Sequence, residues 1–213
     1  MHWYAEAMRL WKRGPVVFSL LALVILATNL LLSVLPIAGT LVAQLVLPLL
    51  ECALLYASLA ADRGDRPRMR HLVAVVAAPQ GAQAAVVVAG LLVFAAEAVV
   101  AQAVGGVNLL APADADSISG LALVCAYAAG IALSLPLMFV PFAALFDGVG
   151  FRQSFAQSVA AFSKNARALV MFGALTLALL LFGLATSGVG LLLALPWSAC
   201  ASYACWKDIF DVA

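Results

Sequence analysis

Four polar residues stand inside long apolar stretches of this sequence, and they are the residues best placed to do chemistry. Glu51 interrupts the run LVLPLLECALLYAS, Glu97 interrupts LLVFAAEAVVA, and Asn29 and Gln44 have similar surroundings. A carboxyl group in apolar surroundings without a nearby cation favours its neutral, protonated form. Such a group either donates a hydrogen bond to a neighbour or exchanges its proton with a ligand. The chemistry to expect is therefore hydrogen bonding, proton transfer or ligand binding.

The composition indicates that these residues are surrounded by lipid. Hydrophobic residues make up 66% of the 213 residues, charged residues make up 10%, and the mean hydropathy is +1.13. A soluble domain carries about 25% charged residues. A helix needs about 20 mostly apolar residues to cross a hydrocarbon core of about 30 Å. Six stretches meet that requirement and are predicted to span the membrane, namely 15–35, 39–61, 82–104, 119–146, 166–186 and 188–206.

The basic residues predict the orientation of these spans. All eleven Lys and Arg residues fall before the first span, in 63–70, in 152–167 and at Lys207, which six spans place on one side. The opposite side has the connections PIAG, GGVNLLAPADADSIS and TSGVG, which contain no basic residue. By the positive-inside rule both termini are predicted to be cytoplasmic. The run 15–35 exceeds the roughly 7–15 residues of a signal-peptide core, so we expect an uncleaved first span.

The predicted spans also give the four polar residues a depth. A rise of about 1.5 Å per residue puts Asn29, Gln44 and Glu97 roughly 8–10 Å below the outer surface and Glu51 about midway. Seven residues separate Gln44 from Glu51, so both lie on one face of the second span.

Two hypotheses explain a carboxyl group at the depth of Glu51. In the first, Glu51 is a neutral pin that donates a hydrogen bond to another hairpin, with Thr176 and Ser198 at similar depth as candidate partners. In the second, Glu51 and Glu97 are proton-carrying sites of a transporter. The sequence favours the pin, because only two acids lie within the spans and no Lys or Arg lies in the hydrocarbon region to pair with them.

Two segments outside the spans have an amphipathic pattern. The first is WYAEAMRLWKRGP, before the first span, in which Tyr4, Met8 and Trp11 recur at helical spacing ahead of basic residues. The second is FRQSFAQSVAAFSKNARA, before the fifth span, in which Phe155, Val159 and Phe162 have the same spacing ahead of Lys164. This pattern predicts helices lying in the headgroup region. The residues expected to contact lipid headgroups are Trp3, Trp11, Lys12, Arg13, Arg152, Lys164 and Arg167.

Each of these segments is followed by a helical hairpin whose returning span carries proline, then Cys-Ala, then Tyr-Ala. The pattern predicts repeat-like units over 1–62 and 150–208, and 69–147 matches them less closely. We therefore predict one all-α membrane domain over 1–213, a polytopic bundle of six transmembrane helices, two or three interfacial amphipathic helices and internal hairpin repeats.

Small residues recur at every fourth position in three of the predicted spans. Such faces let helices approach closely in lipid, so we expect a compact bundle without a wide aqueous pore. The faces are formed by Ala53, Ala57 and Ala61, by Ala122, Ala126, Gly130 and Ser134, and by Ala194, Ser198 and Ser202.

The sequence lacks the patterns of several function classes. His2 and His71 stand beside basic residues outside the spans, and no catalytic, nucleotide-binding or metal-binding motif accompanies them. The four cysteines lie within predicted spans without metal-ligand spacing. The net charge of +1 is not typical of a nucleic-acid-binding protein. We expect no enzyme activity, cofactor, metal or nucleic-acid partner.

Four segments resemble parts of known membrane proteins. They are GFRQSFAQSVAAFSKNARALVMF, LPWSACASYACWKDIF, WKRGPVVF and the stretch from PIAG through LAADRG. With Ser158 and Asn165 on the amphipathic segment, they resemble a broad group of bacterial six-helix inner-membrane proteins. They are also similar in layout to the membrane domain attached to some glycerophosphodiester phosphodiesterases. The resemblance implies a multi-pass protein of the bacterial inner membrane, and it carries over no catalytic residue.

Two functions are compatible with these patterns. The first is an accessory or organising membrane subunit that acts through membrane lipids or another membrane protein, with the aromatic and basic interfacial helices as its working surface. The alternative is a small transporter or lipid carrier in which Glu51, Glu97, Asn29 and Gln44 converge on a cavity between hairpins.

Overall fold

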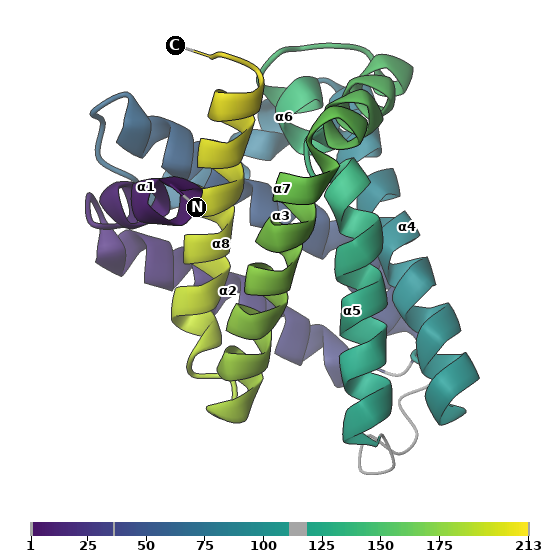
Figure 1. The fold of residues 1–213 in the computed structure, drawn as a ribbon. Helices are drawn as coiled ribbons and strands as arrows, with labels where there is room; N and C mark the ends of the chain where they lie inside the picture. The colour runs from purple at the N-terminus through teal and green to yellow at the C-terminus, as the bar shows by residue number, and fades with distance from the viewer. Residues whose placement is uncertain (1, 36, 111–118, 213) are drawn as a thin grey trace.

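The computed structural model describes residues 2–35, 37–110 and 119–212, and their regular secondary structure is entirely helical (Figure 1). This confirms the all-α prediction for the described residues. Most of the connection 105–119, which is predicted to lie on the outer side, is outside the described residues. The helices are α1 (His2–Trp11), α2 (Pro15–Ser33), α3 (Ala38–Asp62), the 3-10 helix η1 (Met69–Ala77), α4 (Gln80–Gly105), α5 (Gly120–Leu137), α6 (Val140–Leu145), α7 (Phe151–Ala185) and α8 (Leu191–Ile209).

Five of the described helices, α2, α3, α4, α5 and α7, are long and apolar enough to cross a membrane. They fall on the first five predicted spans, although α2, α5 and α7 end before the predicted limits at 35, 146 and 186. The chain is therefore a multi-pass membrane protein. The sixth predicted span, 188–206, falls on α8, which is helical but is not among the five. The last turns of α8 carry Trp206, Lys207 and Asp208, which lower its hydropathy. A count of six spans therefore stays a prediction.

Local residues explain where several helices begin and end. Pro15 stands in the first turn of α2, where the missing N–H of proline costs no hydrogen bond. The Ser119 hydroxyl oxygen accepts the N–H of Ala122 at 3.2 Å and caps α5. Gly106 ends α4 with a φ of 66°, a left-handed conformation that glycine adopts readily.

The predicted span 119–146 is not one helix, because α5 ends at Leu137 and α6 begins at Val140. Pro141 lies in the first turn of α6 and cannot donate the N–H that would continue α5. The buried hydroxyl of Ser158 bridges the break: it donates to the Pro136 carbonyl at 2.7 Å and accepts the Phe139 N–H at 3.1 Å.

Helix α7 contains a break where the sequence predicts one. Asn165 has non-helical angles (φ −122°, ψ 20°) and separates the amphipathic part, 151–164, from the apolar part that follows. The Asn165 side-chain amide donates to the Ala161 carbonyl at 3.0 Å. Figure 1 shows the two parts of α7 running in different directions.

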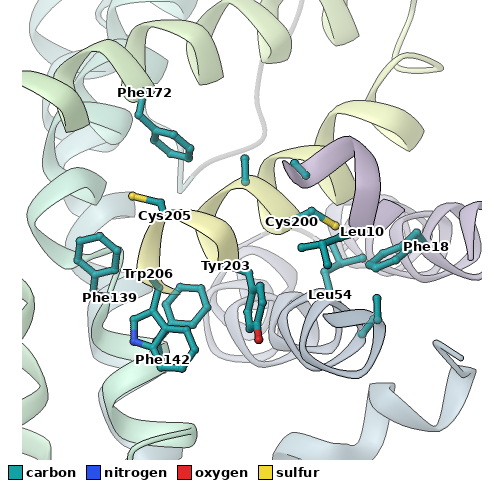
Figure 2. Packing of buried hydrophobic residues seen from close by; sticks show 14 of the residues in the cluster. Leu10, Phe18, Leu54, Phe139, Phe142, Phe172, Cys200, Tyr203, Cys205 and Trp206 are labelled. Carbon is teal, nitrogen blue, oxygen red and sulfur yellow. The ribbon is translucent and has the colours of Figure 1, made fainter. Parts of the chain in front are cut away.

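The largest core cluster surrounds α8 (Figure 2). Trp206 of α8 stacks on Phe142 of α6 with a centroid separation of 5.2 Å, and Phe18 and Leu54 contribute buried side chains from α2 and α3. The small face on α3 is packed as predicted, since Ala53, Ala57 and Ala61 are buried. On α5 Ala122, Ala126 and Gly130 are buried, whereas Ser134 is only partly buried and lines a cavity. On α8 only Ala194 of the predicted small face is buried, because the other two residues line a cavity.

Candidate functional site

A cavity of about 450 Å³ lies between α3, α4, the junction of α5 and α6, and α8. Its walls are mainly apolar, and no lysine, arginine or histidine of the described residues lines it. It separates α8 from α4 and α5. The polar residues that line it are Gln44, Glu51, Glu97, Ser134, Ser198 and Ser202.

Helix α3 supplies Gln44 and Glu51 to this cavity. Their separation of seven residues puts both on the same face of the helix, as the sequence predicts. Pro48, between them, also lines the cavity and lies inside the helix. Glu51 is exposed to this hollow although it lies near the middle of a membrane-spanning helix.

Helix α4 supplies Glu97, which lies directly against the backbone of α5. A Cβ atom built on Gly130 would lie 2.0 Å from Oε1 of Glu97, so a side chain at this position would occupy the space of the carboxyl group. Gly130 is therefore required for the observed position of Glu97. This explains the one glycine in the small-residue face of α5.

A second close approach brings α3 and α4 together. A Cβ atom built on Gly90 of α4 would lie 2.5 Å from Cγ of Pro48, so the two helices touch at the proline ring. Both residues line the cavity, and the contact falls between the levels of Glu51 and Glu97 along their helices. The Gly90–Pro48 contact sets the spacing of the two helices that carry the acids.

The predicted hydrogen bond from Glu51 to another hairpin is absent from the described part of the chain. Thr176 instead bonds with the Tyr4 hydroxyl at 2.9 Å and donates to the Phe172 carbonyl at 3.0 Å, so it faces α1. Ser198 lines the cavity, but its buried hydroxyl has no hydrogen-bond partner among the described residues. The space between helices therefore keeps Glu51 from acting as the predicted pin.

Asn29 does not reach the cavity, contrary to the prediction that four polar side chains converge there. Helix α2 buries Phe18, Leu21, Ala22 and Ile25, and none of its residues beyond Ile25 is buried. Asn29 lies in this last part of α2, after Ile25, and is exposed. Its position follows from where the bundle contacts of α2 end, and it is excluded from the site.

The aromatic residues expected at lipid headgroups pack within the protein. Tyr4 stacks on Phe172 of α7 at 5.4 Å between centroids, and its carbonyl accepts the Trp197 indole N–H of α8 at 3.2 Å. The Trp3 indole N–H donates to Asp208 at 2.9 Å, and Trp11 is partly buried against the core. The aromatic face of α1 is thus occupied by α7 and α8.

The basic residues of the predicted headgroup set are exposed. They are Lys12, Arg13, Arg152, Lys164 and Arg167. Arg13 also donates to the carbonyl of Ala61 at the end of α3. Their exposure leaves them free to meet phosphate groups of lipids, which the aromatic residues of α1 are not.

Sequence reasoning missed a charged cluster where α1, α3 and α8 meet. Asp62 accepts hydrogen bonds from Arg9 Nη2 at 3.0 Å, Lys207 Nζ at 2.7 Å and the Tyr203 hydroxyl at 3.1 Å. Arg9 is also bonded to Glu6. The only signal was an acidic residue at the end of a span among basic ones, ADRGDRPRMR, and it does not name the partners.

The cavity can bind a small molecule whose polar end meets carboxyl, amide and hydroxyl groups and whose remainder is apolar. Two carboxyl groups without a basic neighbour complement a positive charge or a group rich in hydrogen-bond donors. Comparison with protein-family models, with curated proteins and with solved structures finds no match for this chain.

Proposed function

We propose that this chain is a membrane carrier that binds a small amphipathic cation in the cavity between α3, α4, α5 and α8. Glu51 and Glu97 hold the positively charged end, and the apolar walls accept the rest of the molecule. A neutral carboxyl group must lose its proton to pair with a cation, so binding releases a proton. The proposal assigns the chain no catalytic reaction.

One observation carries this proposal: Glu51, Glu97 and Gln44, from two different helices, line the same cavity, which no described basic residue lines. An acid inside a membrane-spanning helix that only stabilises the fold is expected to have a partner. Here Glu51 and Glu97 have no hydrogen-bond or ion-pair partner within the described ranges, and the cavity beside them can receive one from outside.

The accessory-subunit hypothesis has less support. Its working surface included Trp3, Tyr4 and Trp11, and these residues contact α7, α8 and the core. The carrier proposal keeps the predicted contact between the exposed basic residues and anionic lipid headgroups. A cation on a helix at the membrane surface is attracted to phosphate. A protein partner is an alternative outcome of the experiment below.

Under the carrier proposal the chain lies in the inner membrane of a bacterial cell. It has six spans, of which α8 is the sixth, and both of its termini are in the cytoplasm. Support for the repeat organisation comes from the element order, since a short or amphipathic helix precedes the helix pairs α2–α3, α4–α5 and the later part of α7 with α8. The cavity then lies between units rather than within one, as in other carriers built from repeats.

Binding of tetraphenylphosphonium, a lipophilic monovalent cation, tests the proposal. The full chain in detergent is titrated by calorimetry in weak buffer, so that released protons are detected. We expect binding with proton release, and we expect Glu51→Gln and Glu97→Gln each to weaken it at least about tenfold, or about 1.4 kcal/mol. Asn29→Ala is the matched control, because Asn29 is a polar residue of a span that lies outside the cavity.

Two results would contradict the carrier proposal. The first is no binding by the unmodified chain, and the second is equal binding by the Glu51→Gln and unmodified chains. Native mass spectrometry of protein purified gently from its own membrane adds a further readout. A stoichiometric protein partner in place of a bound small molecule would favour the accessory subunit.

A further inference from the structure

A second cavity, of about 230 Å³, lies between the end of α3 and the 3-10 helix η1. Tyr56, Leu59 and Ala60 of α3 line one wall. The other lining residues come from the connection between the two helices and from the start of η1. They are Arg63, Asp65, Arg66, Arg68, Arg70 and His71.

The charges around this cavity are unbalanced. Four arginines line it against a single aspartate. None of the four is hydrogen bonded or ion paired to another side chain in the described ranges, whereas Arg9 and Lys207 both bond to Asp62 nearby. Guanidinium groups around one cavity repel one another, so an anion bound between them lowers their electrostatic energy.

The connection that carries these arginines is held in a defined shape. Gly64 has a φ of 87°, and the Asp65 N–H donates to the Ala60 carbonyl at 2.9 Å, which closes the turn after α3. Pro67 is buried and packs on Gly14 at the start of α2, 3.1 Å from where a Cβ of Gly14 would lie. The arginines before and after Pro67 therefore lie on a connection whose backbone is held in place by packing.

His71 adds an uncommitted polar atom to the same cavity. Its Nε2 atom is buried and has no hydrogen-bond partner among the described residues. Burial, together with Arg70 and Arg68, lowers the pKa of His71, so the imidazole is neutral near pH 7 and offers one donor and one acceptor. A buried polar atom without a partner is unusual, and here it belongs to a residue that lines the cavity.

We propose that this cavity binds a phosphate group, with two or more of Arg63, Arg66, Arg68 and Arg70 as its ligands. The planar guanidinium group matches phosphate oxygens with two parallel hydrogen bonds, and arginine is the usual side chain for this contact. The phosphate belongs either to an anionic lipid headgroup or to a soluble phosphate compound. This site is distinct from the carboxyl-lined cavity, and it stands whether or not that cavity carries a cation.

The site is tested on the full chain with two probes. The first is inorganic phosphate, titrated by calorimetry into protein in detergent. The second is retention of phosphatidylglycerol, read by native mass spectrometry after reconstitution in vesicles of phosphatidylcholine and phosphatidylglycerol in equal amounts. We expect the unmodified chain to bind at least one probe, and the double variant Arg66→Gln, Arg68→Gln to lose about tenfold in affinity, equivalent to about 1.4 kcal/mol.

The matched control is Arg152→Gln, Lys164→Gln, which removes the same charge from exposed positions outside the cavity. We expect it to bind inorganic phosphate as the unmodified chain does; the control is scored with this probe alone, because both residues are also expected to contact lipid headgroups. Selective phosphatidylglycerol retention without phosphate binding supports a lipid headgroup as the ligand. Phosphate binding that displaces the lipid supports a soluble compound. No binding of either probe, or an equal loss of inorganic phosphate affinity in the control, would overturn the site and leave the arginines as orientation signals alone.

Discussion

Two regions of this molecule differ in whether their acidic residues have partners. At the junction of α1, α3 and α8, Asp62 is bonded to Arg9, Lys207 and Tyr203, and only 14% of its side chain is exposed. In the cavity, Glu51 and Glu97 line the space with no described cation beside them. The first acid joins three helices, whereas the other two leave their hydrogen-bonding capacity unused.

The difference separates acids that hold the fold from acids that are available to a ligand. A partly buried carboxylate with matched partners stabilises the folded state, and removing it leaves those partners unsatisfied. A carboxyl group without partners inside a membrane-spanning helix costs stability. A chain is expected to retain it for function, and the two regions should therefore respond oppositely to mutation.

The largest effect is expected at the matched acid. Asp62→Ala leaves Arg9 and Lys207 without their shared partner, and we expect the free energy of unfolding to fall by about 2–3 kcal/mol, less than for a fully buried pair. Arg9 keeps Glu6 as a partner and is 44% exposed, which limits the loss. Titration with a denaturing detergent measures the change.

Tyr203→Phe is the control for this prediction, because it removes one neutral partner of Asp62 and leaves both cations paired. We expect it to cost about 1 kcal/mol. A loss for Asp62→Ala no larger than for Tyr203→Phe would show that the two ion pairs contribute nothing to the stability.

A smaller effect is expected where the backbone of α5 makes room for Glu97. Gly130→Ala places a methyl group in the space of the carboxyl group, and we expect a loss of about 1–2 kcal/mol as Glu97 is displaced. The added variant Glu97→Ala should restore most of that loss. If the double variant is as unstable as Gly130→Ala alone, the strain lies between the helices and not at the carboxyl group.

The unmatched acid itself should matter little for stability. Glu51→Leu removes an unpaired polar group from an apolar cavity, and we expect the free energy of unfolding to stay the same or rise by up to about 1 kcal/mol. Glu51→Gln should also be nearly neutral, while cation binding is lost. A clear fall in stability for Glu51→Leu would return Glu51 to the role of a structural pin.

Much of the fold could be predicted because its signals are local. Apolar run length placed five helices, and the change from an amphipathic to an apolar pattern placed the break near Asn165. The sixth span depends on α8, whose end carries the polar residue Lys207. In the folded protein Lys207 pairs with Asp62, a contact that the local sequence does not indicate. The break between α5 and α6 has a local cause in Pro141, but no local signal predicts that the Ser158 hydroxyl bridges it to Pro136.

The site was predicted to the extent that it depends on one helix. Helical periodicity related Gln44 to Glu51, but the arrival of Glu97 in the same cavity depends on the Gly90–Pro48 contact and on Gly130. Asn29 has the same sequence character as the others and lies outside because α2 runs beyond the bundle contacts. The resemblance to bacterial six-helix membrane proteins stays a prediction.

The smallest effect concerns an exposed acid of the matched region. The hydrogen bond from Arg9 lowers the pKa of Glu6 below its ordinary value of 4.5. The resulting stabilisation is present above the unfolded-state pKa and is lost as the pH falls through the lower folded-state pKa. The side chains are 44% and 39% exposed, so we expect only about 0.3 kcal/mol. Unfolding of the unmodified chain and of Glu6→Gln, compared from about pH 7 to about pH 3, should show a stability difference that narrows in acid. A difference that stays constant with pH would mean that Glu6 acts through packing and not through its charge.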